Sequence, residues 1–358
     1  MLVERVCGIC SGVHTMTLAM AAEALLGLEV PPRARYIRTI ISELERLHSH
    51  LLWAGVAAED IGFQTMFMEV FALRERVMDV LEAISGNTVH YAMNYIGGVN
   101  GDITDPEMLL SAMHELRTKL EQVVVPVFTR NPTVRARVVG VGPLSKEDAL
   151  AYGVVGPFAR ASGLATDVRS DQPYAAYEEL GFQMVVEEGG DIYARMVVRA
   201  LEMLESVRLI EEALKRLPVG PLCAAGGPYT VVSPGEVTVP SEAPRGELLY
   251  YVKADDSDHP ERVKIRTPSY VNIPAIEAMS IGEQLGDLPL IQASLDPCCS
   301  CTDRKLIGIQ GSESGRQEYR FAGLLNAWRS RPACGRGCQN NELIRMGNML
   351  QGSRNDRH

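Results

Sequence analysis

The feature that most constrains the fold is a pair of C-x-x-C motifs near opposite ends of a chain of 358 residues. Cys7 and Cys10 form the first pair, Cys298 and Cys301 form the second, and Cys298 follows Cys10 by 288 positions. Soft thiolates select zinc, iron, nickel or copper(I) over hard cations. If all four sulfurs bind one centre, the chain must fold so that its two ends meet.

The spacing alone leaves three interpretations of these cysteines open. A structural zinc site with four cysteine ligands usually has its halves within a few tens of residues, so the wide separation here is unusual for one. Cys299 also adds a thiol that such a site does not need. The spacing therefore favours a functional metal centre over a structural metal, and a chance or redox arrangement is the third alternative.

Composition and charge exclude several classes of protein. The chain is 46% hydrophobic, which excludes disorder as its dominant state, and its length suits one large domain or two fused ones. A formal net charge of -10 argues against a whole-chain nucleic-acid binder, so we expect no nucleic-acid partner. Eight cysteines are few for a disulfide scaffold. No apolar run reaches the ~18 residues of a membrane span and no secretory signal opens the chain, so we expect a soluble, cytoplasmic protein.

Residues 1–217 are predicted to be mostly helical, because apolar residues recur there at spacings of three and four. Pro31 and Pro32 suit the first turn of one helix, and Asp105 suits the N-cap of another. The apolar stripes favour a helical-bundle core over a cofactor site. The four helices that we expect cover residues 31–52, 67–84, 106–124 and 192–217.

A smaller region with β-strands is predicted from about Pro218 onward, where glycines and prolines separate short β-prone segments. These segments are residues 229–232, 248–253 and 262–265, and the polar turn at 255–258 predicts a hairpin between the last two. The Gly-rich stretch 140–163 is predicted to be turn and loop. The expected fold class is therefore mainly α with a smaller β-containing region.

The last 54 residues, 305–358, differ from the body of the chain. They hold 9 Lys and Arg against 4 Asp and Glu, so they carry +5 in a chain whose net charge is -10. They are rich in Gly, Asn and Arg, and their periodicity is weak. We therefore expect one domain at residues 1–304 and a C-terminal extension at residues 305–358.

The residues that flank the cysteines favour one of the three interpretations. R-x-C-G-x-C-x-x-x-H runs from Arg5 to His14, and D-P-C-x-x-C-x-x-R runs from Asp296 to Arg304. Both halves, in this order and at opposite ends, make the chain resemble the large subunit of [NiFe] hydrogenases. The resemblance implies a helical-bundle core of that large-subunit type.

The resemblance also runs through the interior and covers roughly residues 2–304. The interior blocks look like those of the energy-converting, membrane-associated (group 4) hydrogenases and of their relative, the 49 kDa-type subunit of respiratory complex I. That relative lacks the four metal cysteines, which places this chain on the hydrogenase side. The matching blocks are residues 43–53, 156–163, 167–174, 190–195 and 243–247.

By this resemblance, the four thiolates hold a nickel and an iron, and the iron also carries cyanide and carbon monoxide ligands. Cys10 and Cys301 match the bridging cysteines, and Cys7 and Cys298 match the terminal ones on nickel. Heterolytic cleavage of H2 needs a base beside the metal, and an electron-rich terminal thiolate can serve as that base. The resemblance gives this catalytic role to Cys298.

The same resemblance implies four further residues in the site. Arg245, in Pro-Arg-Gly, matches an arginine over the metal pair, where a guanidinium can donate hydrogen bonds to a diatomic ligand; the alternative is a surface charge. Ser269 matches a residue that hydrogen-bonds a cyanide. Asp296 and His14 match residues that orient the cysteines, and for His14 the alternative is an ordinary structural histidine.

Charged residues inside the helical blocks have two interpretations. Arg160, Asp167 and Arg169, and separately His48 and His50, suit either ion pairs at subunit contacts or a role in proton transfer. By analogy with complex I, they would face the neighbouring iron–sulfur subunit or the membrane arm.

Two departures from the family pattern lead to further expectations. Family members carry a segment before the first motif that supplies strands and a proton-relaying glutamate, whereas here the motif begins at Arg5. We therefore expect a start codon placed too far downstream or a truncated product, and we assign that relay to no residue.

The second departure is the C-terminal extension. The family's maturation protease cuts three residues after the last cysteine, here after Arg304, so residues 305–358 would be removed; readthrough or a frameshifted end is the alternative. Arg304 also stands where many hydrogenases have a histidine that helps to hold magnesium, so magnesium is left unassigned.

The resemblance implies the catalytic subunit of an energy-converting [NiFe] hydrogenase, which reversibly reduces protons to H2. The implied partners are an iron–sulfur small subunit, membrane subunits, and hydrogenase maturation factors with their protease. The implied location is cytoplasmic and peripheral, on the inner face of the cytoplasmic membrane. The alternatives are a non-catalytic, complex-I-like connecting subunit or inactive remnant, and a structural zinc protein.

Overall fold

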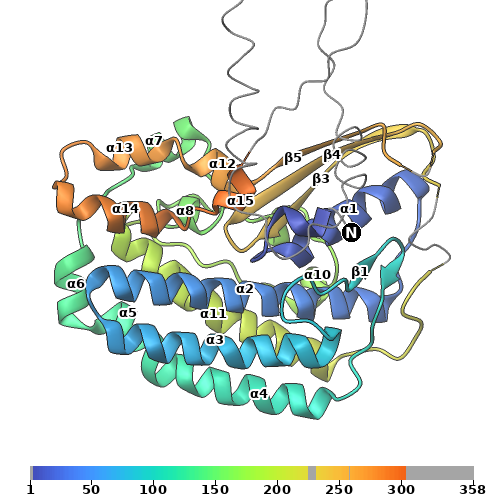
Figure 1. Ribbon diagram of the computed structural model, residues 1–358, viewed down its shortest axis with the longest axis horizontal. Coiled ribbons are helices and arrows are strands. Elements are labelled where there is room, and N and C mark those ends of the chain that lie inside the picture. Colours follow the sequence, from blue (N-terminus) through green and yellow to red (C-terminus); the bar gives the residue numbers. More distant parts are fainter. Residues whose placement is uncertain (1–2, 225–230, 258, 304–358) are drawn as a thin grey trace, which may run out of the picture. The chain divides into compact units, whose positions relative to one another are not determined.

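Helices make up most of the structure, a computed structural model that describes residues 3–224, 231–257 and 259–303 (Figure 1). The smaller β-containing region lies in the second half of the described chain, which confirms the predicted fold class. Residues up to Thr302 form one unit, and a second unit begins at Asp303. The predicted extension at 305–358 and the cleavage site after Arg304 lie outside the described residues.

Four long helices build the bundle, and each matches a predicted helix. α2 packs against both α3 and α11, and α11 also packs against α4 (Figure 1). A π-helical turn at Leu120–Val124 joins α4 to the short helix α5 (Val125–Arg130), which also packs on α11. The four are α2 (Pro32–Ile61), α3 (Gln64–Ser85), α4 (Pro106–Lys119) and α11 (Ile192–Lys215).

The helix ends follow local sequence signals. α2 has a proline at its first position and ends at Gly62, whose left-handed φ of 91° suits glycine. The Asp105 side chain caps α4 by accepting a hydrogen bond from the N–H of Met108 at 2.9 Å. Asp191 caps α11 in the same way. These caps satisfy backbone donors that have no partner within the helix.

Apolar side chains of α2 and α11 form the centre of the main core. Each of the following is 0% exposed: Ile37, Ile40, Leu44, Leu47, Leu51, Met196, Met203 and Ile210. Burying one such side chain stabilises the fold by roughly 1.5–3 kcal/mol relative to exposure. Because this core fixes α2 along its whole length, the polar residues on α2 are held in place as well.

The sheet is antiparallel, with strand order β3-β4-β5, and consists of β3 (Gly235–Ala243), β4 (Gly246–Ala254) and β5 (Arg262–Arg266). The predicted hairpin between β4 and β5 is confirmed. β3 was not predicted, because Pro240 and the surrounding glycines and prolines indicate turns. Pro240 is tolerated because β3 is an edge strand of the sheet within the described residues.

A two-residue turn joins β3 to β4 and contains Arg245, since Ala243 pairs with Gly246. Here glycine is required for close packing. A Cβ on Gly246, whose φ is 129°, would lie 2.8 Å from the Cα of Gly156, and a Cβ on Gly156 would lie 2.3 Å from the Cα of Gly246. The contact of these two backbones fixes the turn that presents Arg245.

The prediction of turn and loop for residues 140–163 is wrong in part. The stretch contains α7 (Lys146–Tyr152) and α8 (Pro157–Arg160). Ser145 caps α7, and Gly153 ends it with a left-handed φ of 64°. The polar residue, glycine and proline therefore mark the ends of short helices here. Of the predicted strand at 229–232, residues 229 and 230 lie outside the described part, and 231–232 are not in a strand.

Both ends of the described chain meet beside the sheet. α1 (Ser11–Leu26) packs on β3 and β4, and α15 (Cys299–Thr302) packs on α12 (Pro268–Asn272), which contacts β4. α14 (Leu288–Leu295) packs on α2 and leads into the second C-x-x-C motif. Figure 1 shows α1 and α15 close together above α2.

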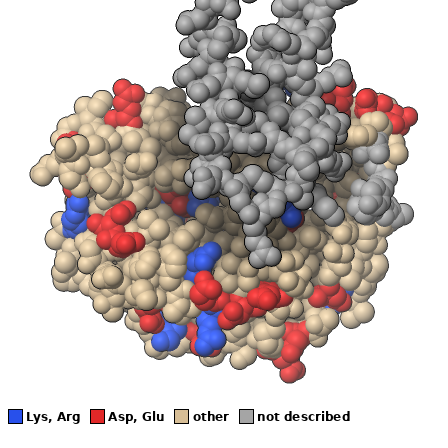
Figure 2. Space-filling view, viewed as in Figure 1, with Lys and Arg blue, Asp and Glu red and all other residues tan. Residues whose placement is uncertain are grey.

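No helix among the described residues is long and apolar enough to cross a membrane. In Figure 2, acidic and basic side chains are intermixed over α3 and α4, as is usual for a solvated helix face.

The remaining elements of the fold are short. They are a 3-10 helix at Val3–Val6, a small hairpin of β1 (Asn94–Tyr95) and β2 (Gly98–Val99), α6 (Pro132–Val138), α9 (Val168–Asp171), α10 (Tyr177–Leu180), α13 (Ala275–Ser280) and a 3-10 turn at Leu285–Asp287.

Candidate metal centre

The four motif cysteines lie together. Sγ of Cys7 is 3.4 Å from Sγ of Cys298, and Sγ of Cys10 is 3.6 Å from Sγ of Cys301. All four side chains are at most 4% exposed, within a second, smaller apolar core between α1 and the sheet. We call these four residues the sulfur centre. The two ends of the described chain therefore lie together, as a common centre for all four sulfurs requires.

Local backbone structure orients the first pair. The N–H groups of Ile9 and Cys10 donate to Sγ of Cys7 at 3.3 and 3.4 Å. Cys10 is also the N-cap residue of α1, and a helix N-terminus favours a thiolate. A C-x-x-C turn at the start of a helix therefore presents both sulfurs to the same side.

Polar side chains hold the second pair. The hydroxyl of Ser269 accepts a hydrogen bond from the N–H of Cys298 at 3.0 Å. The hydroxyl of Thr267 donates to the carbonyl of Cys301 at 2.7 Å. Ser269, which the resemblance gave to a cyanide, thus supports the backbone of a motif cysteine.

The sulfurs perturb one another strongly. Hydrogen bonds from Cys10 and Cys298 hold the pKa of the Cys7 thiol far below its ordinary value. The hydrogen bond to Cys10 and further sulfur contacts raise the pKa of Cys301 far above it. The pKa values of Cys7 and Cys301 shift in opposite directions, so these buried sulfurs compete for protons, which a divalent cation would release by taking their place. This donor set fits a soft metal.

Arg245 lies in this centre with a fixed orientation. Its Nε donates to the carbonyl of Asp296 at 2.9 Å, and a terminal nitrogen donates to Oδ1 of Asp296 at 2.8 Å. The other terminal nitrogen donates to the hydroxyl of Ser49, on α2, at 3.1 Å. Burial disfavours the charge, but Asp296 and the nearby thiolates hold the pKa of Arg245 above its ordinary value.

His14 contacts the sulfur centre from α1. Its Nδ1 lies 2.7 Å from the hydroxyl of Tyr250, and its Nε2 lies 3.9 Å from Sγ of Cys301. The structure therefore brings together every residue that the sequence suggested for the site. Cys7, Cys10, Cys298 and Cys301 form its centre, and His14, Arg245, Ser269 and Asp296 surround them.

Helix α2 contributes side chains that the sequence did not assign to the site. The Glu45 carboxylate accepts hydrogen bonds from the N–H groups of Gly12 and Val13 at 2.6 and 2.9 Å, so it caps α1 from outside. Burial raises the pKa of Glu45 to about 8, although these hydrogen bonds oppose the shift. His48 donates from Nε2 to the carbonyl of Ile9 at 2.8 Å, and burial lowers its pKa to about 3.

Glu45, His48 and Ser49 are spaced so that they share one face of α2. The available signal was this i, i+3, i+4 spacing of polar residues in the middle of a helix that also carries a long apolar stripe. Sequence alone could identify such a face as buried and polar. The sequence could not show that the face meets two motifs about 40 and 250 positions away.

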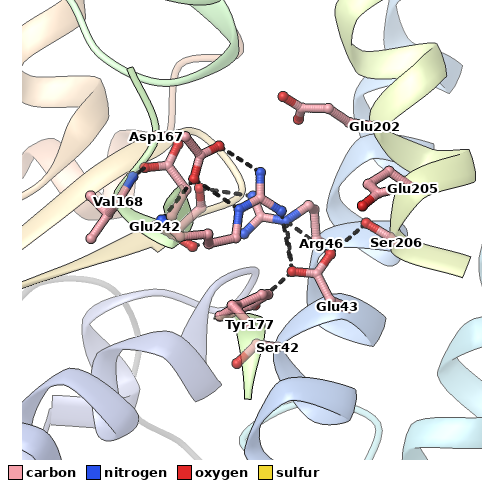
Figure 3. A network of polar contacts seen from close by, with 12 residues as sticks. Ser42, Glu43, Arg46, Asp167, Val168, Tyr177, Glu202, Glu205, Ser206 and Glu242 are labelled. Carbon is pink, nitrogen blue, oxygen red and sulfur yellow. Dashed lines mark hydrogen bonds and ion pairs between the residues drawn. The ribbon is translucent and has the colours of Figure 1, made fainter. Parts of the chain in front are cut away.

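A buried ion-pair cluster lies on the other polar face of α2 (Figure 3). Arg160 pairs with Asp167, Glu202 and Glu242 at 2.8–2.9 Å. Arg169 joins Asp167 at 2.7 Å to Glu43 at 3.2 Å. We define the ion-pair cluster as Glu43, Arg46, Arg160, Asp167, Arg169, Glu202 and Glu242, all at most 2% exposed.

The expectation that Arg160, Asp167 and Arg169 face a neighbouring subunit is wrong. They are buried and pair with residues of their own chain, because α2, the N-cap of α9, α11 and β3 each bring a carboxylate to them. His50 likewise bonds Glu202 through Nε2 at 2.9 Å. Of the two interpretations, ion pairing is observed, but within the chain.

Two known protein families match parts of this chain. The family described as "Respiratory-chain NADH dehydrogenase, 49 Kd subunit" matches residues 60–231 and 225–304, and the family described as "Nickel-dependent hydrogenase" matches residues 1–54. The chain belongs to the oxidoreductase family that joins the 49 kDa subunit of respiratory NADH dehydrogenase to the large subunits of nickel-dependent hydrogenases.

Named relatives come from both branches of this family. The chain is 42% identical to the carbon monoxide-induced hydrogenase of Rhodospirillum rubrum (85% of this chain, 84% of the relative) and 42% identical to the membrane-bound hydrogenase subunit alpha of Pyrococcus furiosus (87% and 77%). It is 37% identical to NADH-quinone oxidoreductase subunit 4 of Thermus thermophilus (82% and 78%).

A solved structure has the same fold. A chain of the membrane-bound sulfane sulfur reductase, an archaeal respiratory membrane complex, superposes with a TM-score of 0.80 at 34% identity, over 85% of this chain and 84% of that one. These relatives are subunits of multi-subunit membrane complexes. Because they include both hydrogenases and quinone oxidoreductases, membership of the family alone does not define the reaction.

Proposed function

We propose that this chain is the catalytic subunit of an energy-converting [NiFe] hydrogenase, which reversibly reduces protons to H2. The single observation that carries the proposal is the sulfur centre: two buried C-x-x-C pairs, 288 positions apart, whose sulfurs lie 3.4–3.6 Å from one another across the pairs. A connecting subunit without metal chemistry has no need to bury four thiols against one another. The hydrogenase relatives at 42% identity support the same choice.

In this proposal, Cys7, Cys10, Cys298 and Cys301 hold nickel and iron, and the iron carries cyanide and carbon monoxide. When bound, this metal pair supplies a site that accepts the two electrons of the H–H bond. Among the described residues, no further cysteine lies in the sulfur centre for an iron–sulfur cluster; Cys299, beside it in the sequence, is exposed. The two electrons therefore have to pass to, or come from, an iron–sulfur partner subunit.

Residues of this chain transfer one proton and hold a fixed positive charge beside the sulfurs. Sγ of Cys298 takes one proton as H2 is cleaved and returns it in the reverse direction, while the second proton goes to solvent. Arg245 keeps a fixed positive charge beside the sulfurs, because Asp296 and Ser49 hold its guanidinium on three sides. A preorganised charge of this kind stabilises negative charge without rearrangement. His14, Ser269 and Asp296 orient the cysteines.

The proposed assembly follows the relatives. Membrane subunits would couple the redox step to ion movement, which places this chain on the inner face of the cytoplasmic membrane. Maturation factors and a protease would load the metals and trim the chain.

A test is to purify the protein with its partner subunits and to measure metals and H2 evolution from a reduced viologen. We expect about one nickel per chain, because the proposed centre of four thiolates holds one nickel beside one iron. Cys298→Ser should lose nickel and activity, whereas Cys223→Ser, outside the centre, should lose neither. Zinc at full occupancy without nickel would refute the proposal.

A second candidate is a non-catalytic connecting subunit of the complex I type. It is favoured by the match of the 49 kDa description over residues 60–304, which is most of the described chain. In that case the protein would assemble with membrane partners, contain no nickel, and evolve no H2. The metal measurement separates the two candidates.

A further inference from the structure

The C-terminal end of α14 is bound by two buried arginines of α11. Arg195 donates to the hydroxyl of Ser294 at 3.0 Å, and Arg199 donates to the carbonyl of Leu295 at 3.2 Å. The two arginine side chains are 0% and 1% exposed. Carbonyl groups in the last turn of a helix have no partner within the helix and carry partial negative charge, so cationic donors suit this position.

Trp53 and Arg245 bind the residues on either side of this pair. The indole N–H of Trp53, on α2, donates to the carbonyl of Ala293 at 2.8 Å, and Arg245 donates to the carbonyl of Asp296 at 2.9 Å. Each of the four consecutive residues 293–296 therefore accepts a hydrogen bond from a side chain of another element. We define the clamp as Trp53, Arg195 and Arg199.

The two positive charges of the clamp have no ion-pair partner, unlike those of the ion-pair cluster. Among the described residues, no carboxylate forms an ion pair with Arg195 or Arg199, whereas Arg160 has three such partners. Burial lowers the pKa of Arg195 to about 9 and that of Arg199 to about 10, so both remain charged at neutral pH. Because apolar side chains could fill these positions without burying charge, the arginines indicate a need for donors at this helix end.

Aromatic rings offset part of the cost of burial and fix the two guanidinium groups. The guanidinium carbon of Arg199 lies 4.6 Å from the centroid of the Trp53 ring, and that of Arg195 lies 4.9 Å from the centroid of Phe158. Arg195 also donates to two loop carbonyls. Within the described part of the chain, the only hydrogen bond from Arg199 to another element is the one to α14, so Arg199 gives the sharpest test.

We propose that the clamp is a set of positioning residues, which hold the end of α14 so that Cys298 reaches the other sulfurs. Asp296 ends α14 with a left-handed φ of 62°, and Cys298 follows two residues later. α14 has only eight residues, and a helix of this length is marginal by itself. The long helices α2 and α11 therefore determine, through the clamp, where the second C-x-x-C motif lies.

The chain offers a matched control on α11. Arg208 lies nine positions after Arg199, pairs with Glu205 at 2.6 Å, and donates to the carbonyl of Gly181 at 2.8 Å. It thus also joins α11 to a carbonyl of another segment, but not to α14. Arg208→Met removes the same group from the same helix without touching the clamp.

The first experiment titrates Co²⁺ into the metal-free full chain and records the thiolate-to-cobalt charge-transfer absorption, which reports how many sulfurs bind. We expect wild-type behaviour in Arg208→Met. In Arg199→Met, the Co²⁺ affinity should fall by about 10- to 100-fold, with weaker charge-transfer absorption per cobalt. Arg199→Lys keeps the charge and should recover part of the affinity. A folded Arg199→Met with the wild-type affinity and spectrum would overturn the proposal.

A milder variant keeps the test decisive if Arg199→Met does not fold. Trp53→Phe retains an aromatic ring under Arg199 but loses the hydrogen bond to Ala293, so the Co²⁺ affinity should fall by about two- to tenfold. An unchanged Co²⁺ affinity in Trp53→Phe would then overturn the proposal.

The second experiment records infrared bands of the diatomic ligands in the protein purified with its partners, and this readout rests on the proposed function. The bands should shift or broaden in Arg199→Met and keep their positions in Arg208→Met, because only the first substitution releases the end of α14. Bands that coincide in all three proteins would contradict an effect of the clamp on the metal-filled centre. A wild type without such bands would refute the proposed hydrogenase function, while the Co²⁺ titration would still test the clamp.

Discussion

The sulfur centre and the ion-pair cluster are two buried polar regions on two faces of α2, and they differ in how their charges are balanced. Every ionised group of the ion-pair cluster has a partner of opposite charge in its own chain. The sulfur centre has thiols against thiols, with one guanidinium beside them. The ion-pair cluster therefore stabilises the fold, whereas the sulfur centre is suited to bind a metal cation.

Helix α2 can serve both regions because of its helical period. Glu43 and Arg46 lie three residues apart on one face, and Glu45 and His48 lie three apart on the other. At about 100° per residue, the mean directions of the two pairs differ by about 160° around the helix axis. Leu44, Leu47 and Leu51 separate the two faces along one side of α2. Substitutions on one of these faces should therefore leave the other face largely intact.

The largest effect is expected for stability, from Arg160→Met. Methionine has a side chain of roughly similar volume, but it leaves Asp167, Glu202 and Glu242 without the cation that they share. The free energy of unfolding should therefore fall by about 3–5 kcal/mol. Denaturant unfolding measures the change. As a control, Arg76→Met breaks an exposed pair with Asp79 at 3.9 Å and should change stability by less than about 0.5 kcal/mol. Equal effects would contradict a structural role for the cluster.

The next effect concerns activity, from Arg245→Lys. A lysine keeps the charge but cannot bind Asp296 and Ser49 at once, so H2 evolution should fall by about 10- to 100-fold. The midpoint of unfolding should move much less than in Arg160→Met. Assays of H2 evolution and nickel content on the same preparation check this, and full activity would remove Arg245 from the site.

The pH dependence of stability is expected to depend on Glu242, where the ion-pair cluster has four carboxylates against three guanidiniums. Burial and the adjacent Asp167 raise the pKa of Glu242 to about 7, from an ordinary value of 4.5. The folded state therefore binds more protons than the unfolded state between these values, and this group lowers stability as pH rises from about 4.5 to 7.

Glu242→Gln should remove that contribution. The difference in unfolding free energy between variant and wild type should grow in favour of the variant as pH rises through this window, and should level off above it. Denaturant midpoints at a series of pH values provide the measurement. A difference that does not change with pH would mean that Glu242 is ionised throughout.

The smallest effect is expected for Ser49→Ala. Arg245 would lose one of three hydrogen bonds and keep both contacts with Asp296, so activity should fall only several-fold, in line with a loss of about 1 kcal/mol. Ser42 lies two turns earlier on α2 and its hydroxyl contacts Met16, so Ser42→Ala serves as the control on the same helix. A loss as large as that of Arg245→Lys would show that Ser49 does more than hold the guanidinium.

Much of the helical bundle could be predicted from the sequence, because α2, α3, α4 and α11 each carry an apolar stripe; α1 has no such stripe and was not among the predicted helices. The strand β3 could not, since Pro240 and the surrounding glycines indicate turns unless the edge position of the strand is known. The short helices α7 and α8 were missed for a related reason: their glycines and prolines mark helix ends, and these residues look the same in loops.

The candidate site was predictable only where a motif carries it. The four cysteines, His14 and Arg245 stand in recognisable local patterns. Glu45, Ser49 and Tyr250 do not, because each acts through a partner that only the tertiary fold brings near. The internal pairing of Arg160 and Arg169 was likewise hidden, since their carboxylate partners come from four separate segments.

The most direct test of the central claim is nickel K-edge X-ray absorption on the protein purified with its partners. The account predicts nickel bound in a sulfur-rich environment, with signal lost in Cys7→Ser and Cys298→Ser and kept in Cys223→Ser. Nickel surrounded by oxygen and nitrogen ligands, or nickel that survives both substitutions, would contradict it.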